Sequence, residues 1–115
     1  MKLDHNATLM RIFVTESARY QRRDLATAIV EALATAGIAG AIVFKGIEGF
    51  GAGGFISSSR SADGWVDLPI LIEVVDEDDK VRAFLPALEA MAEDALVTLE
   101  RVQTVLFRST DTAAR

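Results

Sequence analysis

Hydrophobic and polar positions alternate along the chain in segments that predict four strands and two helices. Apolar residues spaced three or four apart predict helices at about 22–36 and in a later segment that the acidic turn 76–79 opens. Short runs rich in β-branched and other apolar residues, typical of strands, fall at 7–14, 40–46, 68–75 and 96–107. The predicted order of elements is therefore βαββαβ.

This order predicts an α+β fold of the ferredoxin-like type, a sandwich in which a four-stranded antiparallel sheet carries two helices on one face. Leu25, Ile29 and Leu33 give the first helix a single apolar stripe. Gly37 stands where a left-handed residue would end that helix. The local signals thus agree with the element order.

One face of the predicted sheet is left without a cover. We expect the strands at 7–14 and 68–75 to form the central pair, and 68–75 is largely apolar on both of its sides. Two helices on the same side cover only one face of the sheet. A second copy of the chain is the simplest expected cover for the other face.

Length and composition indicate one globular domain. The chain has 115 residues, of which 50% are hydrophobic and 25% are charged. We expect the domain to span 7–108, with flexible tails at 1–6 and 109–115. No apolar run approaches the roughly 20 residues that cross a bilayer, and the first residues lack the apolar centre of a signal peptide. We therefore expect a cytoplasmic protein without direct membrane insertion.

Charge and residue types narrow the range of functions. The net charge of −5 disfavours nucleic-acid binding, which needs a basic face. An RNA-recognition motif has the same element order but places stacking aromatics on its third strand, and 68–75 has none. The chain has no cysteine and one histidine, His5, in the expected tail. These residues assemble neither a nucleophile–base pair nor a histidine-rich metal site, so we expect neither an enzyme nor a metalloprotein.

Glycines cluster directly after the predicted second strand. Five of the eight glycines of the chain fall within residues 46–54. Residues 49–54 match the spacing G-x-G-x-x-G, which binds a dinucleotide only where a helix follows at once. Residues 55–65 have no helical apolar period, so the dinucleotide interpretation fails.

The glycine cluster instead opens a long excursion, residues 47–65, between the second and third strands. Structureless loops of this length are uncommon in compact domains and are usually functional or disordered. Phe50, Phe55 and Trp65 distinguish this segment from a plain hairpin tip. The aromatic residues either anchor the base of the loop or contact a neighbour, a ligand or a partner, and the sequence leaves both open.

A set of short motifs, in order over about 11–107, resembles a known family. The motifs are Glu16-Ser17-x-Arg19-Tyr20, Ala28-Ile29-Val30, Ala36-Gly37-Ile38-Ala39-Gly40-Ala41, Gly46-Ile47-x-Gly49-Phe50-Gly51, Asp67-Leu68-Pro69-x-x-Ile72-Glu73-Val74-Val75-Asp76, Phe84-Leu85-Pro86 and Leu96-Val97-Thr98-Leu99-Glu100. Together they are specific, although each alone is not. The chain resembles the PII-like family known as domain of unknown function one-ninety.

The resemblance implies a regulatory homotrimer whose sheets face the threefold axis. In PII signal proteins the loop between the second and third strands, the T-loop, changes conformation when nucleotides bind between subunits. By this resemblance Gly49 and Gly51 would let the backbone approach a ligand and Phe50 would shape the cleft. The loop at 47–65, with Phe55 and Trp65, would act on a protein partner, for which a membrane transporter is one candidate.

Few cations are available for such a ligand. Lys45 and Arg60 are the basic residues near the glycine cluster, and triphosphate needs concentrated positive charge. We therefore expect an adenine nucleotide less charged than ATP, or another metabolite, as effector rather than as a fixed cofactor. Arg19 and Tyr20 lie in a second basic segment, which either receives an anion or is a solvated helix entry with Arg19 paired to Glu16. The alternative function is a trimeric scaffold that binds its partner constitutively.

Overall fold

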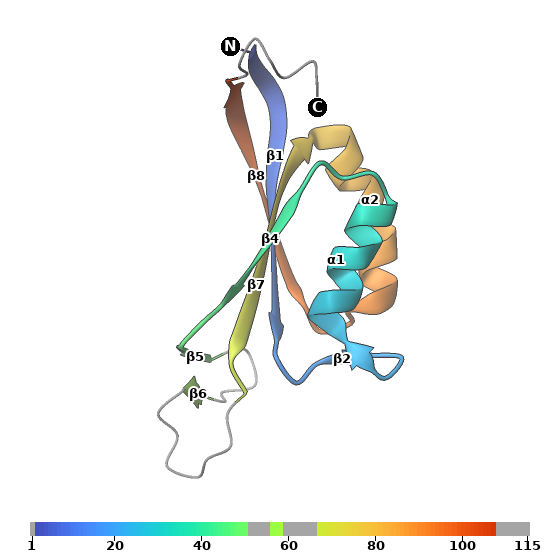
Figure 1. The fold of residues 1–115 in the computed structure, drawn as a ribbon, viewed down its shortest axis with the longest axis vertical. Coiled ribbons are helices and arrows are strands. Elements are labelled where there is room, and N and C mark those ends of the chain that lie inside the picture. Colours follow the sequence, from blue (N-terminus) through green and yellow to red (C-terminus); the bar gives the residue numbers. More distant parts are fainter. Residues whose placement is uncertain (1, 51–55, 59–66, 108–115) are drawn as a thin grey trace.

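The computed structural model describes residues 2–50, 56–58 and 67–107, and its centre is one antiparallel sheet with both helices on one face (Figure 1). The helices are α1 (Leu25–Thr35) and α2 (Asp78–Met91). Across the sheet the strands are β4 (Ala41–Lys45), β7 (Pro69–Glu77), β1 (Lys2–Thr15) and β8 (Leu96–Leu106). The predicted ferredoxin-like fold is confirmed.

The central pair of the sheet is β1 and β7, as the sequence predicts. Their register runs from Ala7 opposite Glu77 to Thr15 opposite Pro69. Alternate residues of both strands point toward the helices, and the largest of these are fully buried: Met10, Ile12, Ile72 and Val74. Ile29, Leu33, Val81, Phe84 and Leu88 of the helices complete this core. The apolar period of the sequence thus determines which face each element buries.

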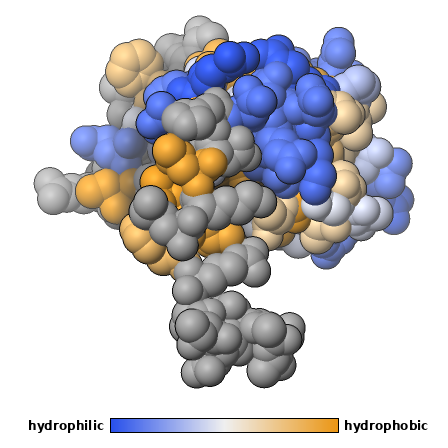
Figure 2. Space-filling view, turned by 90° about the horizontal axis from the view of Figure 1, so that it is seen from above, coloured by the Kyte–Doolittle hydropathy of each residue, from blue (hydrophilic) through white to orange (hydrophobic). Residues whose placement is uncertain are grey.

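No described element covers the other face of the sheet. By strand register this open sheet face carries large apolar side chains that are at least a third exposed: Phe13, Ile42, Phe44, Val75 and Leu96. Near its middle, Arg11 Nε lies 2.9 Å from Glu73 Oε2, and Arg11 Nη1 lies 3.9 Å from Glu100 Oε2. Figure 2 looks down the long axis: the most apolar visible residues gather at the left and centre, and hydrophilic ones cover much of the upper right.

The N-terminal segment departs from the sequence-based expectation. Residues 2–6 belong to β1 rather than to a flexible tail, because Lys2, Leu3 and Asp4 pair with the end of β8. The register shifts between Asp4 and Ala7, which marks a bulge. The paired ends of β1 and β8 therefore project beyond the helices (Figure 1).

A small hairpin replaces the expected loop and the first turn of the first helix. The strands β2 (Arg19–Tyr20) and β3 (Arg23–Asp24) are joined by Gln21 and Arg22, whose φ angles are 49° and 71°. A two-residue turn with both φ positive matches the right-handed twist of a hairpin. As a result α1 begins at Leu25 rather than at about 22.

Two further boundaries follow local rules. Gly37, with φ 81°, ends α1 in the left-handed conformation, as predicted. Asp76 and Glu77 extend β7 instead of opening α2, and the Asp76 carboxylate accepts a 2.9 Å hydrogen bond from the Ala39 N–H. None of the helices in the described part of the chain has the length and apolar character needed to span a membrane.

Candidate functional site

The base of the glycine-rich segment is packed against one proline. After β4, the Gly46 N–H donates a 2.8 Å hydrogen bond to the carbonyl of Pro69, the first residue of β7. A Cβ on Gly46 would lie 2.6 Å from Pro69 Cγ, and one on Gly49 would lie 3.2 Å from the same atom. These two glycines therefore have an intramolecular role, since they leave room for the proline ring.

The segment beyond Gly46 is not structureless where it is described. Glu48–Phe50 forms β5, which pairs antiparallel with β6, Ile56–Ser58. The Phe50 side chain is 77% exposed, so it packs on little of its own chain. At residues 48–50 and 56–58 this pairing replaces the expected loop, and the small sheet lies beyond the end of the central sheet opposite the paired ends of β1 and β8 (Figure 1).

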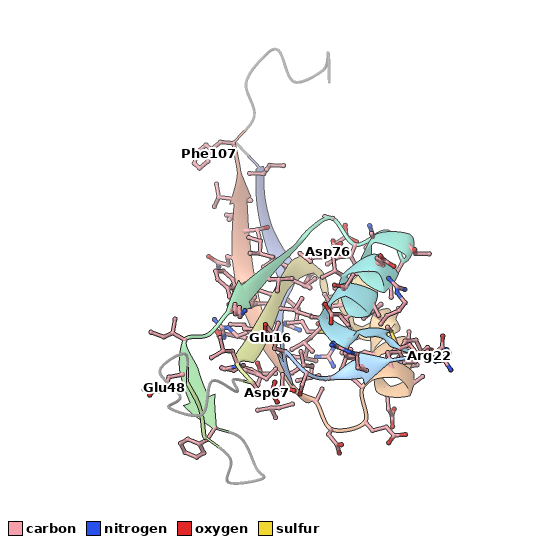
Figure 3. The ribbon with its side chains drawn as sticks, turned by 60° about the horizontal axis from the view of Figure 1, so that its bottom comes forward. Glu16, Arg22, Glu48, Asp67, Asp76 and Phe107 are labelled. Carbon is pink, nitrogen blue, oxygen red and sulfur yellow. The ribbon has the colours of Figure 1, made fainter. Side chains whose placement is uncertain are left out.

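The turn Glu16–Ser17, which follows β1, contacts the chain where it enters β7. The Asp67 carboxylate accepts hydrogen bonds from the Ser17 N–H at 2.9 Å and from its hydroxyl at 2.7 Å. The Glu16 N–H donates to the Leu68 carbonyl at 2.9 Å. In Figure 3 Glu16 and Asp67 lie at the same end of the sheet.

The same turn also contacts the end of β4. Lys45 Nζ lies 2.8 Å from Glu16 Oε1, and the two side chains are 53% and 43% exposed. The hydrogen bond from Lys45 lowers the pKa of the Glu16 carboxyl below its ordinary value. The sequence left open an ion pair between Arg19 and Glu16. This pairing is wrong, because the Glu16 carboxylate pairs with Lys45 instead. The Arg19 guanidinium binds the Asp24 carboxylate, and its Nη1 lies 3.5 Å from the Glu16 carbonyl.

The second basic segment is divided among different roles. Tyr20 is partly buried against the hydrophobic core. Arg23 is paired with Glu31 of α1. Arg22 is exposed at the turn of the hairpin, and Figure 3 places it away from Glu16, on the side of the helices. Lys45 thus contacts the carboxylate of Glu16 and Arg19 contacts its backbone carbonyl. The arginines at 19, 22 and 23 are not gathered into one site.

The remaining sequence-based candidates are not among the described residues. Gly51, Phe55, Arg60 and Trp65 lie outside the described ranges. Of the candidates that the structure describes, Lys45, Gly49 and Phe50 fall on consecutive elements at the loop base. The candidate site is thus the sheet end formed by the exit of β4, the entry of β7 and the turn after β1.

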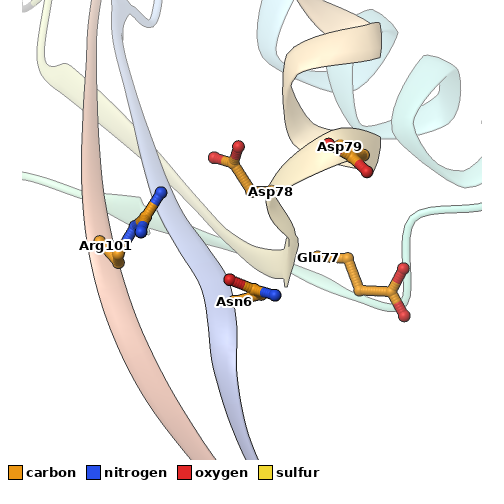
Figure 4. A pocket seen from close by; sticks show the side chains of 5 residues that line it. All are labelled: Asn6, Glu77, Asp78, Asp79 and Arg101. Atoms are coloured by element: carbon orange, nitrogen blue, oxygen red, sulfur yellow. The ribbon is translucent and has the colours of Figure 1, made fainter.

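A polar pocket lies at the other end of β7 (Figure 4). It has a volume of about 330 Å³ and is lined by Asn6, Glu77, Asp78, Asp79 and Arg101. The buried Thr8 hydroxyl donates a 2.6 Å hydrogen bond to Asp78 Oδ1, and Arg82 Nε donates to the same carboxylate. The Thr8 bond first, and the Arg82 bond second, lower the pKa of Asp78. These contacts hold Asp78, the first residue of α2, so this lining residue of the pocket has a structural role in fixing the start of the helix.

Four residues of the candidate site were missed by the sequence analysis as functional positions: Glu16, Ser17, Asp67 and Pro69. All four stand in motifs that carried the family resemblance, which is the signal that could have found them. Only the fold shows that the two motifs meet, because Ser17 and Asp67 lie 50 positions apart.

The fold is that of PII-like proteins. One solved structure that it matches is CPII, a nitrogen regulatory PII-like protein from Thiomonas intermedia K12, with a TM-score of 0.61 and 19% identity over 90% of this chain and 91% of that one. Another is a protein from Thermus thermophilus described as PII-like and signaling, with a TM-score of 0.62 and 21% identity over 91% of this chain and 94% of that one.

Within this class, the chain belongs to the family DUF190, described as "Uncharacterized ACR", whose model matches residues 7–104. Two UPF0166 proteins of Aquifex aeolicus (strain VF5) are similar to it: one is 29% identical over 97 residues, 84% of this chain and 91% of the relative, and the other is 32% identical over 95 residues, 83% and 93%. A UPF0166 protein of Methanocaldococcus jannaschii is 30% identical over 94 residues, 81% and 86%. The family resemblance seen in the sequence is confirmed.

Proposed function

We propose that the chain is a PII-like regulatory protein that assembles as a homotrimer, senses a small anionic ligand between subunits and acts on a protein partner rather than as an enzyme. The observation that carries this proposal is the open sheet face. Phe13 of β1 and Ile42 and Phe44 of β4 stand exposed there, on the two strands that flank β7 in an otherwise well-packed fold. Exposed apolar patches of this kind mark interaction surfaces, and most oligomers are built from identical chains.

The sheet end at the loop base is the proposed ligand site. Lys45 supplies a positive charge, and the exposed ring of Phe50 is free to stack on a base. The structure of the Thiomonas PII-like protein is described as bound to ADP, AMP and bicarbonate. ADP and AMP are therefore the first ligands to test, and Gly51 and Arg60 remain proposed members of the site.

The proposed partner surface begins at the same sheet end. Ile47 is 75% exposed beside β5, and a partner would bury it together with Phe50. The proposal extends this surface through Phe55 and Trp65. A ligand bound at the base would then change how the segment 47–65 meets its partner, and a membrane transporter is the partner class that we propose to test first.

Native mass spectrometry tests the assembly. The expected mass is three times the 12.4 kDa of the chain. Phe44→Glu places a charge on the open sheet face and is expected to yield monomer, whereas Ile47→Glu adds the same charge at an exposed position beyond the end of β4 and is expected to keep the trimer. A monomeric wild-type protein, or dissociation by Ile47→Glu alone, would overturn this assembly.

A thermal-shift series with ATP, ADP, AMP, cyclic AMP and bicarbonate tests sensing. A ligand at 100 times its dissociation constant adds about 2.7 kcal/mol to the free energy of unfolding. A constitutive trimeric scaffold is the second candidate function, and the pairing of Lys45 with Glu16 and of Arg19 with Asp24 favours it, because a phosphate would have to displace a carboxylate from either charge. A trimer with no shift for any ligand would select the scaffold.

A further inference from the structure

The Glu16–Ser17 turn binds both sides of the loop base, but through contacts of different character. On the β7 side, Ser17 and Glu16 make three hydrogen bonds to Asp67 and Leu68, two of them from backbone N–H groups. On the β4 side, the hydrogen-bonded contact among the described residues is the ion pair between the side chains of Glu16 and Lys45. The turn is therefore firmly attached to the entry of β7 and attached to the exit of β4 by one ion pair.

The ion pair is the contact that a dissolved anion can exchange. Both side chains are about half exposed, so a ligand can reach the Lys45 ammonium from solvent. Exposed pairs of this kind contribute little to stability, and an incoming phosphate offers the ammonium equivalent oxygen acceptors. The hydrogen bond from the Glu16 N–H to Leu68 does not involve the carboxylate, so the turn stays in place when the pair opens.

We propose that Glu16 is a built-in competitor for anionic ligands at Lys45: the ligand and the Glu16 carboxylate exclude one another, and ligand binding releases the end of β4 from the turn. This inference rests on the proposed function, because it takes the ligand to be an anion such as ADP. It adds a regulatory step at that site. The exit of β4 is joined to the turn while Glu16 occupies Lys45, and it loses this link when the ligand takes Lys45, while its hydrogen bond from the Gly46 N–H to the Pro69 carbonyl stays.

Isothermal titration with ADP tests the competition. Glu16→Gln keeps the shape and an oxygen acceptor but removes the competing charge, and it is expected to bind ADP about two- to fivefold more tightly than wild type. Lys45→Ala is expected to bind more weakly. Glu31→Gln is the matched control, because Glu31 is an exposed carboxylate paired with Arg23 elsewhere, and its affinity is expected to equal that of wild type.

The outcomes separate this inference from the proposed function. If Lys45→Ala weakens ADP binding and Glu16→Gln does not strengthen it, the competition is wrong and the ligand site stands. If wild type does not bind ADP, sensing of ADP is wrong, and hydrogen exchange of the ligand-free protein decides the role of the pair. Faster exchange at 46–50 in Glu16→Gln than in wild type and Glu31→Gln is the expected result. Equal exchange would overturn the release of β4.

Discussion

Replacing Gly46 by alanine is expected to destabilise the protein by a steric contact with one identified atom. The added Cβ would stand 2.6 Å from Pro69 Cγ, a distance that real Cβ atoms essentially never show. The Gly46 N–H is also bound to the Pro69 carbonyl at 2.8 Å, so the backbone cannot move away without losing that hydrogen bond. Overpacking of this kind costs about 1–3 kcal/mol.

Urea denaturation at one fixed protein concentration measures this cost, since the stability of an oligomer depends on concentration. With a slope of about 2 kcal/mol per molar urea, the midpoint is expected to fall by about 0.5–1.5 M. Gly40→Ala is the control, because a Cβ there meets nothing within 4 Å. Its stability is expected to be unchanged or to rise by up to about 1 kcal/mol, from the lower entropy of the unfolded chain.

A double-mutant cycle with Pro69→Ala isolates the contact. Removing the ring takes away Cγ and Cδ, and the next atom near the new Cβ is the Pro69 carbonyl oxygen at 3.4 Å. The Gly46→Ala change is therefore expected to cost less in the Pro69→Ala background, with a coupling of about 1 kcal/mol or more. Equal costs in both backgrounds would refute the steric explanation, whatever the effect of the single variant.

Two other predictions concern the hairpin and the start of α2. Arg22→Gly is expected to raise the free energy of unfolding by about 0.5–1 kcal/mol in the same urea assay. The reason is that φ at Arg22 is 71°, a conformation that glycine adopts without strain. A lower stability of this variant would mean that the Arg22 side chain makes a stabilising contact. Thr8→Val removes the main cause that lowers the pKa of Asp78. The ionised Asp78 carboxylate stabilises the fold at a pH above the ordinary aspartate pKa, and this contribution is lost as the pH falls through the lowered pKa of the folded state. The difference in the free energy of unfolding between wild type and Thr8→Val is therefore expected to narrow below about pH 4. A difference that stays constant with pH would contradict this prediction.

The fold was predictable because, along most of the chain, the apolar residues that recur with the period of a strand or a helix are the residues that the fold buries. Ile12 and Ile72 occupy the buried face of the central strands, and Leu33 lies on the buried stripe of α1. The extension of β1 to Lys2 was not predictable from residues 2–6, which are mostly polar. Their pairing with β8 is a long-range contact, and local propensity does not report such contacts.

The small hairpins were missed for a related reason. The turn at Gln21 and Arg22 has positive φ at both residues but contains no glycine or asparagine, the usual signals for such a turn. In the candidate site, sequence proximity pointed from Glu16 to Arg19, three positions away, whereas the fold brings Lys45 from 29 positions away. The residue types of a site can be recognised in a sequence, but their partners depend on which strands become neighbours.

The Arg11 group on the open sheet face has a consequence for assembly. There, one guanidinium lies within 4 Å of carboxylate oxygens from two glutamates, Glu73 and Glu100. If three copies meet through this face, each brings one negative charge more than Arg11 balances. Dissolved cations would then reduce the mutual repulsion of the copies, so association is strengthened by moderate salt instead of weakened by it. The ionic strength of the surroundings would thus set how readily the chains join.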